Sequence, residues 1–131
     1  MKFLLLISGL IFLAACSDST AYQEPLPVEA RFSSIQVNLF DRSCAISGCH
    51  NGSQAPNLSG SGSYSRIVNV SSGNGGLDFI EPGNPSQSLL YLSLVGGSGV
   101  RVDRMPQGQT QLPAAITDSI RVWIANGAPN N

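Results

Sequence analysis

Cys44-Ala45-Ile46-Ser47-Gly48-Cys49-His50 places two thiols and an imidazole within one short stretch of the chain. Four residues separate the two cysteines, and the histidine directly follows the second cysteine. His50 is the only histidine among the 131 residues, so any site that needs an imidazole must use this one. We therefore expect the chemistry of the protein to centre on this stretch.

A thiol pair followed by a histidine is typical of c-type haem attachment. The two thiols form thioethers to the vinyl groups of a haem, and the histidine lies under the iron. The usual spacing is C-x-x-C-H, whereas this chain has C-x4-C-H, so the stretch is a variant of the motif. We therefore expect one covalently bound haem c.

A second candidate ligand stands in Arg104-Met105-Pro106-Gln107-Gly108. A thioether is a soft ligand suited to low-spin iron, and His/Met ligation raises the reduction potential of cytochromes c. Pro106 fixes a backbone angle and Gly108 permits an unusual turn, which predicts an irregular loop that presents Met105. The alternative is that Met105 fills a gap in the core.

The two cysteines have a simpler use, which is a disulfide. The short separation can close a small loop, and an oxidising compartment allows the bond. His50 would then have no role. A structural zinc site is disfavoured, because two Cys and one His leave it one ligand short of four.

The N-terminus predicts export and a lipid anchor. Residues 3–15 form a nearly continuous apolar run, which is shorter than the roughly 20 residues that span a bilayer and is typical of a signal peptide. The run ends in Leu13-Ala14-Ala15-Cys16, which resembles the lipobox of bacterial lipoproteins. That resemblance implies removal of residues 1–15 and acylation of Cys16. A plain secretory signal is the alternative.

The lipobox also implies a location for the protein. Each buried methylene of an acyl chain contributes about 0.8 kcal/mol, and more than one chain gives a stable anchor. Ser17 rather than Asp follows the cysteine, which in Gram-negative lipoproteins favours the outer membrane. We expect a lipid anchor to attach the chain to a bacterial membrane. We expect that membrane to be the outer membrane, with the domain in the periplasm.

Length and charge favour one small domain that does not bind nucleic acid. Removing residues 1–15 leaves 131 − 15 = 116 residues. Lys2 is the only lysine, so six Arg then face eight acidic residues, a net charge of 6 − 8 = −2. Nucleic-acid binding requires clustered cations, which this composition does not supply. We expect residues 16–29 to be a flexible tether and residues 30–131 to be the domain.

Apolar periodicity predicts a mostly α domain with long loops. We predict helices over 30–43, from Asn84-Pro85 to Gly96, and from Pro113 to Gly127. Residues 51–63 and 71–76 are predicted loops, 64–70 is either a helical turn or a strand, and no hairpin is expected. One face of the last helix should be buried, with its tryptophan packed on the first helix; the face comprises Ile116, Ile120, Trp123 and Ile124.

Four blocks in a fixed order resemble a monohaem c-type cytochrome domain of bacterial lipoproteins, of the group with a widened C-x4-C-H site. The blocks are 44–52, 80–90, 104–108 and 116–128, and together they cover about residues 32–128. The resemblance implies a cytochrome c-like helical domain wrapped around one covalent haem. It implies that Cys44 and Cys49 bind the haem, that His50 is the proximal ligand and that Met105 is the distal ligand.

These features predict an electron carrier rather than an enzyme. With both axial positions filled by the protein, the iron exchanges single electrons with redox partner proteins, and membrane contact is through a lipidated Cys16. Arg101 and Arg104 flank the methionine and are candidates to pair with haem propionates, or are simply solvated charges. The alternative function is a non-haem lipoprotein in which a Cys44–Cys49 disulfide closes an envelope binding or structural domain. A peroxidase is a weaker alternative, because it needs an open iron position.

Overall fold

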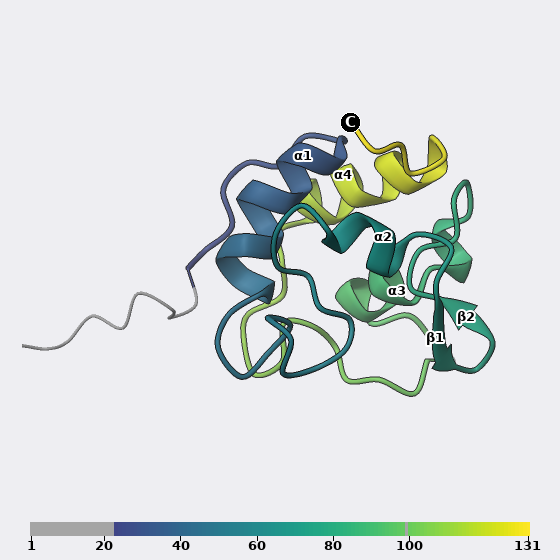
Figure 1. Cartoon of the computed structure of the whole chain (residues 1–131), viewed down its shortest axis with the longest axis horizontal. Coiled ribbons are helices and arrows are strands. Elements are labelled where there is room, and N and C mark those ends of the chain that lie inside the picture. Colours follow the sequence, from purple (N-terminus) through teal and green to yellow (C-terminus); the bar gives the residue numbers. More distant parts are fainter. Residues whose placement is uncertain (1–22, 99) are drawn as a thin grey trace, which may run out of the picture.

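The computed structural model describes residues 23–98 and 100–131, so the expected signal peptide at 1–15 and the expected lipid site at Cys16 lie outside the described residues. Helices provide most of the regular structure, and long loops lie before α2 and between α3 and α4 (Figure 1). The elements are α1 (Phe32–Ile35), η1 (Gln36–Cys44), α2 (Ser63–Ile67), β1 (Ser71–Asn74), β2 (Leu77–Asp78), η2 (Pro85–Gln87), α3 (Leu89–Val95) and α4 (Ala114–Ala125).

The helix predicted over 30–43 is confirmed as one continuous helical segment from Phe32 to Cys44, but its geometry changes along its length. The first turn, α1, is an α-helix, and the nine residues of η1 form a π-helix. A π-helix longer than a single turn is rare, and π-helical geometry is frequent at functional sites. Here it ends at Cys44, the first residue of the thiol–histidine stretch.

Residues 23–29, which are the described part of the segment expected as a tether, lie along η1. The Gln23 amide donates to the Arg42 carbonyl over 3.2 Å. The Ser43 hydroxyl donates to the Gln23 carbonyl over 2.6 Å. The chain therefore enters the domain beside the helical turn that ends at Cys44.

An aromatic cluster joins the first helix to the last. Trp123 of α4 is fully buried, and its ring centroid lies 5.7 Å from that of Phe32 in α1. Tyr64 of α2 packs edge-on against Phe32 with the centroids 5.1 Å apart, and its hydroxyl donates to the Ala128 carbonyl. The Trp123 indole donates to the Pro129 carbonyl over 2.9 Å. The predicted packing of Trp123 on the first helix is confirmed, and α1 and α4 lie side by side in Figure 1.

The rest of the last helix also follows the sequence pattern. Pro113 caps its start, and Gly127 beyond its end has a φ of +90°, a left-handed conformation that favours glycine. All four residues of the predicted apolar face are buried: Ile116, Ile120, Trp123 and Ile124. They join a core to which α1, η1 and α3 also contribute buried side chains.

Residues 71–78 form a hairpin, so the prediction of a loop over 71–76 and of no hairpin is wrong. β1 pairs antiparallel with β2, and Asn74 stands opposite Leu77. Gly75 and Gly76 both have positive φ, at +64° and +78°. Such a pair matches the right-handed twist of two strands joined by a two-residue turn. The hairpin depends on backbone pairing and this turn, and it lacks the alternating apolar residues that identify strands in a sequence.

The helix predicted to begin at Asn84-Pro85 is divided in two. η2 makes one short turn, and α3 begins only after Ser88, whose backbone is extended at φ −100° and ψ 107°. The fully buried Ser88 hydroxyl accepts from the Glu81 amide over 2.9 Å and donates to the Asn84 carbonyl over 3.0 Å. Such local bonds from serine compete with helix formation. Gly96, with a φ of +71°, ends α3 as predicted.

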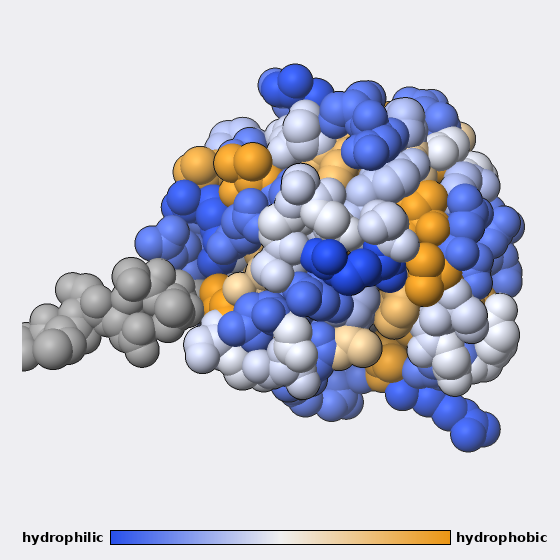
Figure 2. Space-filling view, in the orientation of Figure 1, coloured by the Kyte–Doolittle hydropathy of each residue, from blue (hydrophilic) through white to orange (hydrophobic). Residues whose placement is uncertain are grey.

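The described surface is largely polar on the face shown in Figure 2, with separated apolar groups. Leu26 and Val37 are the large apolar residues with the highest exposure, at 45% and 60%. No helix within the described ranges is both long enough and apolar enough to cross a membrane.

We predict that Trp123→Ala lowers the free energy of unfolding by roughly 3–5 kcal/mol, because it opens a cavity between α1 and α4 and leaves the Pro129 carbonyl without its donor. Urea unfolding followed by circular dichroism measures this. Val37→Ala is the control, because Val37 is 60% exposed and should change stability by less than about 0.5 kcal/mol. Equal effects of the two variants would show that the aromatic cluster is not the centre of the core.

Candidate cofactor-binding site

η1 leads directly into the stretch from Cys44 to His50. The Cys49 amide donates to the Ile46 carbonyl over 3.0 Å, and the His50 amide donates to the Cys44 carbonyl over 3.0 Å. Gly48, with a φ of +80°, supplies the left-handed residue that lets the chain reverse. The four-residue spacer is therefore a closed loop that ties the histidine back to the first cysteine.

The four residues expected to bind haem line two adjoining hollows. The two hollows share Cys44, His50, Leu94 and Met105 in their walls, and Cys49 lines the second of them. We call the two together the central hollow. The remaining wall of the first is almost entirely apolar and includes Leu39, Phe40, Leu58, Phe79, Leu89 and Leu90.

A backbone carbonyl holds the His50 ring. Its Nδ1 lies 3.1 Å from the carbonyl oxygen of Pro56. A carbonyl oxygen can only accept a hydrogen bond, so Nδ1 must carry the proton and donate it. In the neutral imidazole the lone pair is then on Nε2, which is the form that binds a metal. Pro56 was not predicted as a site residue, because every residue has a carbonyl and no side-chain pattern marks this one.

Met105 is held by α3. Its amide donates to the Ser93 carbonyl over 2.9 Å. The Gln109 amide donates to the Pro106 carbonyl over 3.2 Å, and Gly108 has a φ of +72°. The predicted irregular loop around Met105 is confirmed. It places the thioether in the wall of the central hollow that also contains His50.

The two thiols are separate and not joined in a disulfide. Burial, with a smaller contribution from the charge of Cys49, raises the pKa of the Cys44 thiol to about 12. Cys44 therefore keeps its proton at neutral pH.

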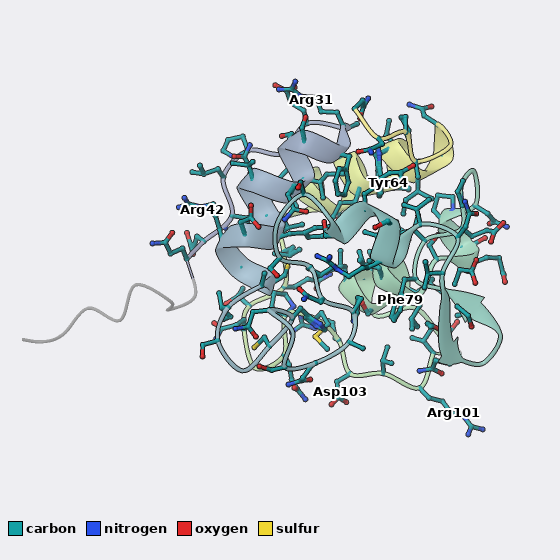
Figure 3. The ribbon with its side chains drawn as sticks, in the orientation of Figure 1. Arg31, Arg42, Tyr64, Phe79, Arg101 and Asp103 are labelled. Atoms are coloured by element: carbon teal, nitrogen blue, oxygen red, sulfur yellow. The ribbon has the colours of Figure 1, made fainter. Side chains whose placement is uncertain are left out.

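Charged side chains are absent from the described walls of the central hollow. Arg104 lies outside these walls and donates to the Gln109 carbonyl over 3.1 Å. Arg101 is exposed, and its side chain points away from the body of the domain in Figure 3. Across 23–98 and 100–131, no three or more His, Cys, Asp or Glu residues are grouped so as to hold a bare metal ion.

Comparison with family models, curated proteins and solved structures found no match to this chain.

The raised pKa of Cys44 predicts slow alkylation. In haem-free chain with Cys16 and Cys49 replaced by Ser, we expect iodoacetamide at pH 8 to modify Cys44 more slowly in the folded state than in urea, because only the thiolate reacts and burial, the larger cause of the raised pKa, remains. In the chain that keeps Cys49, the folded Cys44 thiol keeps its proton while the unfolded thiol begins to lose it near pH 9.0, so the free energy of unfolding should fall as pH rises from about 9 to about 12. The control keeps Cys44 and changes only Cys16. Equal folded and unfolded rates would mean that Cys44 is not buried.

Proposed function

We propose that this domain is a c-type cytochrome that carries one covalent haem and transfers single electrons. Cys44 and Cys49 would hold the haem through thioethers, and His50 and Met105 would bind its iron. The observation that carries the proposal is the convergence of these four residues on two adjoining hollows, the first of them largely apolar, with the His50 ring oriented by Pro56 so that Nε2 is free to bind iron.

The thiols suit attachment by addition. Each thiol adds across one vinyl double bond: an S–H bond and a C=C π bond break, and a C–S bond and a C–H bond form. Atoms and electrons balance without an added oxidant. The step requires two thiols that are not joined in a disulfide, and Cys44 and Cys49 are not joined.

The chain's own residues favour electron transfer over catalysis. When bound, the haem would supply an iron that takes up one electron on reduction and releases it on oxidation. His50 and Met105 would occupy both axial positions, which leaves none for a substrate. The apolar wall of the first hollow and the Met105 thioether would both favour reduced iron and so raise the reduction potential.

The alternative of a disulfide-closed lipoprotein is less well supported, because the two sulfurs are not joined and the oriented histidine would then have no use. The proposal includes lipid attachment at Cys16, a place at the outer membrane with the domain in the periplasm, and redox partner proteins. The lipobox pattern at residues 13–16 supports lipid attachment, and Ser17 after the cysteine supports the outer membrane.

We predict that chain produced in a host able to mature c-type cytochromes carries one haem that survives acid–acetone extraction. Mass spectrometry of the intact mature protein separates haem, a disulfide and acylation in one measurement. Cys44→Ser with Cys49→Ser should abolish the covalent haem, while Cys16→Ser, the control, should retain it. A colourless mature protein with a Cys44–Cys49 disulfide would exclude the proposal.

We predict that Met105→Ala removes the thioether–iron charge-transfer absorption and lowers the midpoint potential, because a ligand that favours reduced iron is lost. Optical spectra and a redox titration measure both changes. Val102→Ala is the control, because Val102 lines the same hollow without a donor atom. An unchanged spectrum in Met105→Ala would remove Met105 from the ligand set.

A further inference from the structure

Arg66 of α2 holds the backbone that supports the histidine. Its Nε donates to the Asn57 carbonyl over 2.8 Å, and its Nη2 donates to the Ser59 carbonyl over 2.5 Å. A guanidinium presents its donors in a rigid planar fork, so it fixes the two carbonyls relative to each other. Asn57 directly follows Pro56, whose carbonyl accepts the bond from His50.

Gln36 of η1 holds the Leu58 carbonyl, which lies in the chain between the carbonyls of Asn57 and Ser59. Its Nε2 donates to the Leu58 carbonyl over 2.9 Å and to Oδ1 of Asp41 over 2.6 Å. Its Oε1 accepts a hydrogen bond from the Ser63 hydroxyl. Gln36 is 6% exposed and Ser63 is fully buried, so breaking these bonds leaves buried polar atoms without partners. The amide is thereby fixed in the orientation that the Leu58 carbonyl requires.

The segment 56–59, which we call the clamped segment, contacts His50 at both its ring and its backbone. The Pro56 carbonyl accepts from the ring Nδ1, and the Leu58 amide donates to the His50 carbonyl over 2.7 Å. Three successive carbonyls of this segment are held by side chains from α2 and η1. The position of the Pro56 oxygen therefore depends on Arg66 and Gln36.

We propose that Arg66 and Gln36 are positioning residues that set the strength of the bond from His50 Nδ1 to the Pro56 carbonyl, and through it the reduction potential of the haem iron. This inference rests on the proposed function. A strong bond at Nδ1 makes Nε2 a better electron donor, which favours the oxidised and more positive iron. Loosening the clamped segment weakens that bond and raises the potential.

Gly62 offers a way to move the Arg66 guanidinium without removing it. A Cβ at position 62 would lie 2.7 Å from Nη1 of Arg66, so the flexible end of that side chain must shift. The backbone of Gly62, at φ −76° and ψ −5°, accepts alanine. Gly62→Ala should therefore displace the Arg66 guanidinium at little cost in stability. Ser61→Ala is the matched control, because Ser61 is exposed in the same loop.

The test uses the haem-loaded full chain. We expect Gly62→Ala and Arg66→Lys to raise the midpoint potential, to move the NMR signal of the His50 Nδ1 proton, and to speed hydrogen exchange at the Leu58 amide about tenfold, as loss of a hydrogen bond predicts. Ser61→Ala should leave all three readouts unchanged. The thioether–iron absorption is recorded alongside, so that loss of Met105 is recognised.

The outcomes separate this inference from the function on which it rests. A wild-type chain without covalent haem contradicts the proposed function. A haem-loaded Gly62→Ala chain with an unchanged or lowered potential, while the thioether–iron absorption is intact, overturns the positioning role. Faster Leu58 exchange with an unchanged potential also overturns it, because the network would then only stabilise the loop.

Discussion

The hydrogen bond from the His50 ring to the Pro56 carbonyl is the constraint on which the candidate site depends. An imidazole on a loop would otherwise rotate and exchange hydrogen bonds with water. Because Nδ1 is the donor, the lone pair of the neutral imidazole is on Nε2. The same hydrogen bond also fixes the orientation of the ring. The bond is useful only because Pro56 is itself fixed, by a segment whose next three carbonyls are all occupied by side chains from two helices.

The π-helix η1 is followed directly by the four-residue spacer between Cys44 and Cys49. η1 ends at Cys44, and the spacer then closes on itself because the His50 amide bonds the Cys44 carbonyl. The long spacer is thus a compact loop in which both thiols and the imidazole face the central hollow. Residues 23–29 lie against the same helix, so a tether that precedes them would end beside Cys44.

The apolar residues of the domain form one core, part of which also lines the central hollow. The rings of Phe32, Tyr64 and Trp123 pack α1, α2 and α4 together without any cofactor. Leucines of η1 and α3 belong to the same core and also line a hollow that has no charged residue in its described walls. A small domain buries less of its surface than a large one, so an apolar cofactor in that hollow would add to its core.

Periodicity and chemistry along the chain were enough to predict the first and last helices, the burial of Trp123, and the four residues that meet at the hollow, because side-chain type and spacing carry those signals. They did not predict the hairpin at 71–78, the break at Ser88, or the roles of Pro56, Gln36 and Arg66. These features depend on backbone carbonyls and amides, which every residue has. Which carbonyl meets which amide or side chain depends on how distant segments pack together. Only the tertiary structure therefore decides these hydrogen bonds.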